Sequence, residues 1–420
     1  MNVRITPSAT QGTLKAIASK SAAHRLLICA AFADAETAVL CEEINDDIKA
    51  TVRCLSALGA DIVRDGAIYR VKPIKELIRG ASLDCGESGS TMRFLVPLTC
   101  MLGADASFVM SGRLPERPLS PLREELERCG IEFSPALSNP MVCRGKISGH
   151  DFSIRGDVSS QFISGLLFAL AVSGSAGSIN IIGKLESAPY VDMTADALRC
   201  FGVGVHRTAD GYAIKENNGL RSPGDVFVEG DWSGAAFPLC LGAVGKGSVT
   251  LRGIDTSSRQ GDRAIVSLLE RFGAKVELGE RTVIVSPAPL RGIEIDASQI
   301  PDLVPILAVV GALAEGRTVI YNAERLRIKE SDRLQTTCDT LNALGAKIEQ
   351  TSDGLIIDGV SSLTGGRVSS FGDHRIAMSA AVASARATGE VIIEGAHAAA
   401  KSYPAFWTDM RALGMIIDEK

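Results

Sequence analysis

The sequence predicts an α/β protein of two globular domains, each containing three copies of one repeated unit. Two series of helix ends recur along the 420 residues at intervals of about 70, and each end is followed by a short apolar run of strand type. The composition agrees, because 46% hydrophobic and 22% charged residues are ordinary for a globular chain with ample length to bury a large core.

The first series consists of amphipathic segments that end in glycine. In each segment, apolar residues at helical spacing precede the glycine and a run typical of a strand follows it. Glycine just after a helix supplies the left-handed residue that ends the helix and starts the strand. The glycines are separated by 71, 72, 71, 72 and 69 residues, and they are Gly59, Gly130, Gly202, Gly273, Gly345 and Gly414.

The second series lies between the members of the first. Each member is a helix of small apolar residues that runs directly into a strand. The apolar residues that anchor these strands are Val39, Phe108, Ile179, Val249, Val319 and Val391. Each repeated unit therefore contains two helices with strands between them, and six units divide into two domains of three.

The domain boundary is predicted at the polar, turn-rich stretch NNGLRSPGD, residues 217–225. The leading strand, VRITPS, precedes the first helix and has no unit of its own, so we expect it to join the second half. The expected domains are residues 13–224 and residues 1–12 with 225–420, and the chain would cross between them twice.

Composition also limits the possible environment and partners. The formal charge of −5 and the pI near 5.7 argue against a dedicated nucleic-acid or membrane-surface binder. The ten cysteines form no C-x-x-C pair, which is typical of reduced thiols. No signal-like segment opens the chain, and no apolar run reaches the roughly 18 residues of a membrane span. We therefore expect a soluble, intracellular protein.

A charged run, KESDRL at residues 329–334, belongs to a set of helix starts that carry cations. The N-terminus of a helix attracts phosphates and carboxylates through its unpaired N–H groups and its dipole. Asp, Ser and Asn at such positions are ordinary N-caps, but capping does not explain why lysines and arginines collect at an end that repels them. We expect the repeated units to direct several of these N-termini toward one cleft between the domains. The cations are Lys20, Arg25, Arg93, Arg117, Lys329, Arg333, Arg375 and Lys401.

Eight motifs, in order along the whole chain, carry a family resemblance: KSAAHR, ESGSTMR, RP at 117–118, SSQF, PDLVP, KESDRL, GDHRIAM and AKSYP. Together they resemble the 5-enolpyruvylshikimate-3-phosphate (EPSP) synthase family. The resemblance implies two halves, each of three βαβαββ units, arranged as an inside-out α/β barrel. It implies transfer of the enolpyruvyl group of phosphoenolpyruvate to the 5-hydroxyl of 3-phosphoshikimate, with release of phosphate. It implies no metal or organic cofactor. From the composition we expect no nucleic-acid or membrane partner and a cytoplasmic location, and we expect a monomer.

The resemblance also assigns the residues that bind substrate. It implies that the first domain mainly binds 3-phosphoshikimate and the second mainly phosphoenolpyruvate. Both substrates carry a carboxylate and a phosphate, and the Arg and Lys residues of these motifs suit both groups. The implied contacts to 3-phosphoshikimate are Lys20, Ser21, Arg25, Ser159, Ser160, Gln161, Ser187, Tyr190, Asp302 and Lys329. The implied contacts to phosphoenolpyruvate are Lys20, Gly89, Arg117, Gln161, Arg333, His374, Arg375 and Lys401.

The chemistry needs an acid near carbon 3 of phosphoenolpyruvate and a base near the 5-hydroxyl, because protonation of carbon 3 makes carbon 2 electrophilic. The implied catalytic residues are Asp302, Glu330 and Lys20. We interpret Asp302 as the base, with N-capping of the next helix as the simpler explanation. Glu330 is the first choice for the acid, and this assignment stays open.

Three positions depart from the family pattern. Glu87 and Ser90 of GESGS stand where the family often has asparagine and threonine, and Arg325 stands where asparagine often precedes the K-E-x-D-R motif. An acid beside an anionic substrate is unfavourable unless a cation compensates it, so we expect Glu87 to have a cationic neighbour.

Two other functions are compatible with parts of the pattern. A UDP-N-acetylglucosamine enolpyruvyl transferase has the same architecture and donor, but it typically carries a cysteine before its Arg-Pro, and this chain has none between Cys100 and Cys129. A nucleic-acid clamp without chemistry would spread its basic residues along an inner helix face. Here they gather at helix starts beside Ser, Asp and Glu, which disfavours a clamp.

Overall fold

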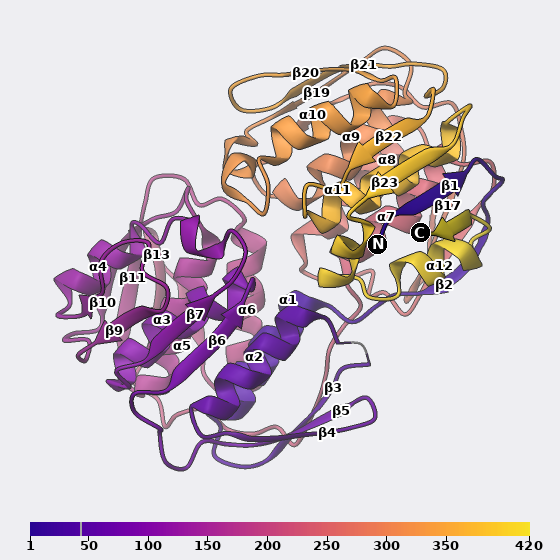
Figure 1. Cartoon of the computed structure of the whole chain (residues 1–420). Helices are drawn as coiled ribbons and strands as arrows, with labels where there is room; N and C mark the ends of the chain where they lie inside the picture. Colours follow the sequence, from indigo (N-terminus) through magenta and orange to yellow (C-terminus); the bar gives the residue numbers. More distant parts are fainter. Residues whose placement is uncertain (43) are drawn as a thin grey trace. The chain divides into compact units, whose positions relative to one another are not determined.

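The computed structural model describes residues 1–42 and 44–420, which form two compact units (Figure 1). One unit comprises Lys20–Val228, and the other comprises Met1–Ser19 together with Glu229–Lys420. Within the described residues, no helix is both long and apolar enough to span a membrane.

The unit Lys20–Val228 contains three four-stranded sheets among the described residues. In spatial order, the sheets are β14 (Asp225–Phe227), β3 (Thr37–Leu40), β5 (Ile68–Lys72) and β4 (Asp61–Asp65); β6 (Ser82–Gly86), β7 (Ser107–Met110), β9 (Met141–Arg144) and β8 (Glu132–Phe133); and β10 (Asp151–Arg155), β11 (Gly177–Ile182), β13 (Gly211–Ile214) and β12 (Val205–Arg207). The helices are α1 (Lys20–Ala31), α2 (Asp46–Ala57), α3 (Gly89–Leu102), η1 (Leu114–Glu116), α4 (Leu122–Arg128), α5 (Ser160–Ser173) and α6 (Ala188–Cys200).

The other unit repeats this plan with three more sheets in the described part of the chain. They are β16 (Lys275–Leu278), β17 (Thr282–Ser286), β15 (Val249–Arg252) and β2 (Gly12–Lys15); β18 (Glu294–Asp296), β19 (Arg317–Tyr321), β21 (Leu355–Asp358) and β20 (Lys347–Gln350); and β22 (Gly366–Ser369), β23 (Val391–Glu394), β1 (Val3–Thr6) and β24 (Ile416–Glu419). The helices are α7 (Trp232–Val244), η2 (Gly261–Ala264), α8 (Ile265–Phe272), η3 (Pro301–Leu303), α9 (Val304–Ala312), η4 (Glu324–Ile328), α10 (Arg333–Ala343), α11 (His374–Ala383), η5 (Ser384–Arg386), η6 (Ala396–Lys401) and α12 (Phe406–Ala412).

All six sheets of the described residues share one pattern, which confirms the predicted α/β class and its repeats. A parallel pair of strands is extended by two antiparallel strands, as in β6–β7–β9–β8. Each of the six repeated glycines has a positive φ between 84° and 116°, directly after the end of α2, α4, α6, α8, α10 or α12 or one residue later. The six apolar anchors all lie in strands, and they occupy β3, β7, β11, β15, β19 and β23.

The chain passes between the units at residues 19–20 and 228–229, whereas the predicted divisions are 12–13 and 224–225. The difference arises because each crossing follows a strand instead of preceding it. Strand β2 pairs in parallel with β15, and β14 pairs in parallel with β3. These two sheets therefore each include one strand from a distant part of the sequence. The leading strand β1 pairs with β23 and β24, which confirms that it joins the second half.

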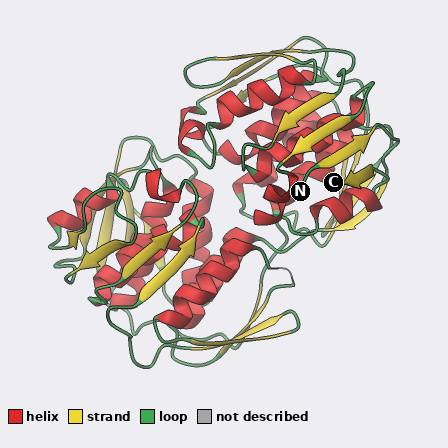
Figure 2. Ribbon diagram, viewed as in Figure 1, coloured by secondary structure: helices red, strands yellow, loops and turns green. Residues whose placement is uncertain are grey.

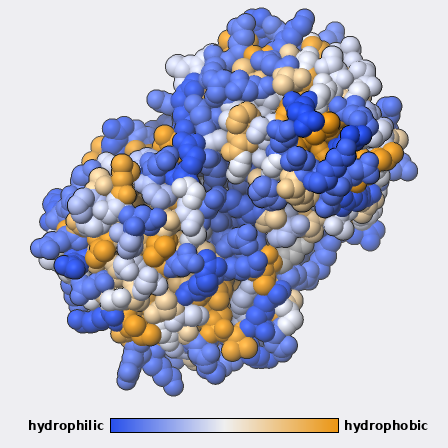
Figure 3. Space-filling model, viewed as in Figure 1, coloured by the Kyte–Doolittle hydropathy of each residue, from blue (hydrophilic) through white to orange (hydrophobic). Residues whose placement is uncertain are grey.

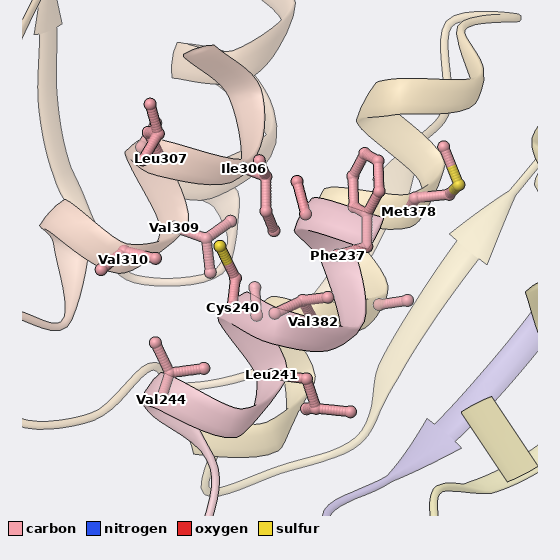
Figure 4. Packing of buried hydrophobic residues seen from close by; sticks show 14 of the residues in the cluster. Phe237, Cys240, Leu241, Val244, Ile306, Leu307, Val309, Val310, Met378 and Val382 are labelled. Carbon is pink, nitrogen blue, oxygen red and sulfur yellow. The ribbon is translucent and has the colours of Figure 1, made fainter. Parts of the chain in front are cut away.

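Within each unit, helices form the interior and strands lie outside them (Figure 2). In the unit with both termini, α7, α9 and α11 contact one another, and almost every residue of each is buried. Figure 4 shows Phe237 and Cys240 of α7 near Ile306 and Val309 of α9. A helix that is apolar on all sides is stable only in such an interior. The visible surface is mostly polar, with scattered apolar residues (Figure 3).

Candidate active site

Arg333 is the centre of an ion-pair cluster in the unit that carries both termini. It is the first residue of α10, and the side chain of Asp332 caps this helix by accepting a hydrogen bond from the Gln335 N–H. Only 2% of the Arg333 side chain is exposed, so its charge requires buried partners. The charged run KESDR is therefore not a solvated helix face.

Three carboxylates surround the Arg333 guanidinium. Its Nε donates to Asp373 Oδ2 at 2.8 Å, its Nη1 donates to Asp302 Oδ1 at 2.9 Å, and its Nη2 donates to Glu330 Oε2 at 2.8 Å. Asp373 is fully buried, and it also accepts hydrogen bonds from Ser331 Oγ and from the Arg375 N–H at the start of α11. Asp373 thus caps α11 and orients Arg333 at the same time.

Arg375 and Lys329 approach the same carboxylate, that of Asp302. Arg375 Nη2 lies 3.2 Å from Asp302 Oδ2, and Lys329 Nζ lies 3.9 Å from Asp302 Oδ1. Arg375 also donates to the backbone oxygen of Asp302 at 2.9 Å and to Ser233 Oγ at 2.6 Å. The sequence does not predict Ser233, which lies in the first turn of α7.

The cations determine the protonation state of Asp302. Burial alone would raise the pKa of Asp302, but Arg375, Lys329 and Arg333 outweigh it and hold that pKa well below its usual range. Burial lowers the pKa of Lys329 to about 8, although Asp302 opposes this shift. Asp302 is therefore ionised near neutral pH, and Lys329 is close to losing its proton in mildly alkaline solution.

The simpler explanation of Asp302, that it caps the following helix, is wrong. Asp302 lies inside η3, and neither η3 nor α9 has a side-chain cap hydrogen bond. About a quarter of the Asp302 side chain is exposed, and its carboxylate faces Arg333 and Arg375.

In the unit Lys20–Val228, α1 presents Lys20 at its first position. Lys20 Nζ donates to Asp47 Oδ2, 2.9 Å away in the first turn of α2. One turn later, the buried Arg25 donates to Thr194 Oγ1 and to the backbone oxygens of Ser21 and Tyr190. These contacts attach α1 to the start of α6.

The start of α3 provides a second group of predicted residues. A Cβ placed on Gly89 would lie 3.0 Å from Arg117 Nη1, so the Arg117 guanidinium covers this turn closely. Ser90 Oγ accepts a hydrogen bond from Gln161 Nε2, and Gln161 Oε1 accepts one from Arg93 Nη1.

Helix α5 can approach α3 this closely because residue 165 is glycine. A Cβ on Gly165 would lie only 2.4 Å from the backbone oxygen of Arg93. Gln161 is one turn before Gly165, and Ser159 caps α5 by accepting a hydrogen bond from the Gln161 N–H. Close packing of the two helices therefore positions Gln161.

The predicted residues divide between the two units. The group in Lys20–Val228 comprises Lys20, Ser21, Arg25, Gly89, Arg117, Ser159, Ser160, Gln161, Ser187 and Tyr190. The group in the other unit comprises Asp302, Lys329, Glu330, Arg333, His374, Arg375 and Lys401. Ser187 is buried in a left-handed conformation with φ 54°, just before α6. His374 is buried beside Asp373, and Lys401 is half-buried at the end of η6.

Two of the three departures from the family pattern, Ser90 and Arg325, make local hydrogen bonds in the structure. Ser90 keeps a hydroxyl that bonds Gln161, and Arg325 Nη2 donates to the Ser298 backbone oxygen at 3.0 Å. The Glu87 side chain lies against Gly112, where an added Cβ would be only 2.3 Å from Glu87 Oε1. The cationic neighbour expected for Glu87 stays a prediction.

Sequence reasoning missed several partners of the predicted cations, chiefly Asp47, Asp373, Ser233 and Thr194. Asp47 lies in the stretch INDDIK, residues 44–49, and Asp373 lies in the motif GDHRIAM. Acidic residues at the start of a helix are a signal that sequence reasoning could have used. Ser233 lies two residues after Asp231, the N-cap of α7, in the stretch EGDWSG. Its place at a helix start is a weaker signal of the same kind. Thr194 lies inside α6, and no sequence signal marks it.

Comparison with known proteins gives one consistent result. The family model described as "EPSP synthase (3-phosphoshikimate 1-carboxyvinyltransferase)" matches residues 5–410. A 3-phosphoshikimate 1-carboxyvinyltransferase of Clostridium kluyveri is 42% identical over 419 residues, covering 99% of this chain and 98% of that protein. One from Clostridium perfringens is 42% identical over 422 residues, covering 100% and 99%.

Solved structures agree with this result. An EPSP synthase from Acinetobacter baumannii superposes with a TM-score of 0.81 at 25% identity, covering 100% of both chains. The enolpyruvyl transferase NikO from Streptomyces tendae superposes with a TM-score of 0.78 at 20% identity, covering 100% of this chain and 98% of the other. At that identity, the second likeness shows the fold alone.

Proposed function

The chain belongs to the EPSP synthase family, and on this premise we propose that it transfers the enolpyruvyl group of phosphoenolpyruvate to the 5-hydroxyl of 3-phosphoshikimate, releasing phosphate. This is the activity of a 3-phosphoshikimate 1-carboxyvinyltransferase, a step of the shikimate pathway toward chorismate and the aromatic amino acids. Family membership over nearly the full chain supports the assignment.

The observation that carries the proposal is the cation cluster around Asp302. Arg333, Arg375 and Lys329 lie 2.9, 3.2 and 3.9 Å from its carboxylate oxygens. Arginines in this arrangement suit a carboxylate or phosphate, and phosphoenolpyruvate carries both. Asp302 supplies such an anion from within the chain, and we propose that phosphoenolpyruvate takes over part of these contacts.

The reaction then requires proton transfers at two atoms. Protonation of carbon 3 makes carbon 2 electrophilic, and the 5-hydroxyl attacks carbon 2 as it loses its proton. The adduct then loses phosphate from carbon 2 and a proton from carbon 3. This restores the double bond between the two carbons and leaves the enolpyruvyl group attached to the 5-oxygen. Asp302 is the proposed acceptor of the hydroxyl proton, and Glu330 and Lys20 are the proposed residues for proton transfer at carbon 3.

Donor binding would prepare Asp302 for this role. A carboxylate held by three cations is a weak base, because each cation stabilises the ionised form. Anions of phosphoenolpyruvate on Arg333 and Arg375 would compensate those cations and so raise the basicity of Asp302. Asp302 would therefore become an effective base only after phosphoenolpyruvate has bound.

The unit Lys20–Val228 is proposed to supply most contacts to 3-phosphoshikimate through Lys20, Ser21, Arg25, Ser159, Ser160, Gln161, Ser187 and Tyr190, and the other unit adds Asp302 and Lys329. Phosphoenolpyruvate would contact Lys20, Gly89, Arg117, Gln161, Arg333, His374, Arg375 and Lys401. We propose that the chain acts as a monomer in the cytoplasm.

Phosphate release tests the function directly. The chain is incubated with phosphoenolpyruvate and either 3-phosphoshikimate or UDP-N-acetylglucosamine. We expect release only with 3-phosphoshikimate. Release only with UDP-N-acetylglucosamine would favour the other enolpyruvyl transferase, and no release with either would refute the proposal.

A further inference from the structure

A chain of buried hydrogen bonds joins α1, α2 and the start of α3. His24 Nδ1 lies 2.6 Å from Thr51 Oγ1, Thr51 Oγ1 lies 2.7 Å from Thr91 Oγ1, and Thr91 Oγ1 donates to Ser88 Oγ at 2.7 Å. Each of the four residues is at most 1% exposed. This relay, defined as His24, Thr51, Thr91 and Ser88, is not among the residues assigned to substrate.

Each end of the relay lies next to a residue of the candidate site. On α1, His24 is one turn after Lys20, and on α2, Thr51 is one turn after Asp47, the partner of Lys20. On α3, Ser88 is the N-cap and directly precedes Gly89. The relay therefore connects the Lys20–Asp47 pair to the Gly89 turn through the interior of the unit.

The relay is well placed to set a position accurately. Burial lowers the pKa of His24 to about 3, so the ring is neutral and bonds Thr51 without carrying a charge into the core. The ring also packs edge-on against Phe94 of α3, with the centroids 6.4 Å apart. His24 Nε2 is buried and has no hydrogen-bond partner among the described residues, so Nδ1 makes the ring's polar contact. Loss of one member would leave the next buried hydroxyl with a missing partner.

Other contacts decide which element would move if the relay broke. Arg25 holds α1 through Thr194 Oγ1 and the Tyr190 backbone oxygen, independently of the relay. The turn before α3 is held by the backbone bond from the Ser88 N–H to the Cys85 oxygen at 2.9 Å, and its side-chain cap on the Thr91 N–H is longer, at 3.3 Å. The Gly89 turn, which lies against Arg117, would therefore shift more than α1.

We propose that His24, Thr51, Thr91 and Ser88 are positioning residues that hold the Gly89 turn in place relative to Lys20 and Asp47, and thereby set the affinity for phosphoenolpyruvate. This role rests on the proposed function. The relay touches no reacting atom, so its loss should affect the Michaelis constant for phosphoenolpyruvate more than the turnover number.

The test compares Thr51→Val, which removes the central hydroxyl at nearly constant volume, with Thr51→Ser, which restores it. Thr99→Val is the matched control, because Thr99 is equally buried in α3 but its hydroxyl bonds the backbone of its own helix at Leu95. The assay is phosphate release, with KM for each substrate and kcat determined separately. Thermal melting of each variant reports folding.

We expect Thr51→Val to raise KM for phosphoenolpyruvate roughly tenfold, an effect that loss of the buried hydrogen bonds to His24 and Thr91 allows. KM for 3-phosphoshikimate and kcat should stay within about threefold. Thr51→Ser should bring KM for phosphoenolpyruvate back to within about threefold of wild type, and Thr99→Val should leave it unchanged at a comparable loss of melting temperature. If Thr51→Val does not fold, Thr91→Val and Thr91→Ser make the same comparison at the next link.

Two results would overturn the inference. Equal KM values for phosphoenolpyruvate in Thr51→Val and Thr99→Val would mean that the relay only packs the core. A tenfold rise in the KM values of Thr51→Val for both substrates would mean that the relay supports the whole unit. Wild-type protein without phosphate release would instead remove the proposed function, and this role with it.

Discussion

Replacing Asp302 by asparagine separates its proposed role as a base from its role as an ion-pair partner. Asparagine has nearly the same size and can accept a hydrogen bond from Arg333, but it cannot accept a proton near neutral pH. The structure excludes loss of a helix cap as a complication, since neither η3 nor α9 has a side-chain cap.

The cost in stability follows from the partners that remain. Arg333 keeps Asp373 and Glu330, and Arg375 keeps Ser233 and the backbone oxygen of residue 302. The change therefore replaces charge-assisted hydrogen bonds at the two arginines by neutral ones, and Lys329, whose Nζ lies 3.9 Å from Asp302 Oδ1, loses that ion pair. We expect a loss of about 1–2 kcal/mol. In a unit of this size, that corresponds to a fall in melting temperature of about 2–8 °C.

The expected cost in catalysis is much larger. Loss of a general base typically reduces the rate by ~10²–10⁴, and the reduction should appear in kcat. Binding of 3-phosphoshikimate, measured by calorimetry, should change by less than about tenfold, because most of its proposed contacts lie in Lys20–Val228.

The control is Asp358→Asn, which breaks an exposed ion pair with Arg317 in the same unit. It should leave kcat and melting nearly unchanged, because exposed pairs contribute little. If Asp302→Asn melts cooperatively and turns over within a few-fold of wild type, the reasoning is refuted. Asp302 would then serve only as a partner of Arg333 and Arg375, and Glu330 would be the next candidate for the base.

Three further changes test other parts of the site. Gly89→Ala places a Cβ 3.0 Å from the Arg117 guanidinium, so phosphoenolpyruvate should bind more weakly while 3-phosphoshikimate affinity stays within about twofold; equal weakening of both in titrations would contradict a donor-specific pocket. Asp373→Ala strands the buried Arg333 with two carboxylates in place of three and should cost about 3 kcal/mol in denaturant unfolding, whereas Asp373→Asn should cost less; equal losses would mean that charge is unimportant there. Lys329, with its pKa lowered to about 8, is protonated below that pH and neutral above it, so kcat/KM should fall above pH 8 and Lys329→Arg should move this limb to higher pH; an unmoved limb would assign it to another group.

Local chemistry explains why much of the fold could be predicted from the sequence. A glycine after a helix and an apolar run after that glycine are properties of neighbouring residues, and all six glycines adopt the left-handed conformation. The helix starts were also predictable, because Ser88, Ser159, Asp332 and Asp373 cap helices through their own side chains. The motifs at those starts carried the family resemblance.

Strand pairing and side-chain partners depended on tertiary structure. Strand β2 pairs with β15, which is 237 residues away along the chain (Gly12 with Val249), and β14 pairs with β3, 187 residues away (Asp225 with Ala38). No local signal identifies such a distant partner. The same holds within the site. The amino-acid sequence alone predicts that cations gather at helix starts. Only the packed units decided that Asp302 is held by Arg333, Arg375 and Lys329, and Lys20 by Asp47, because the strength of an ion pair depends on distance and burial in three dimensions.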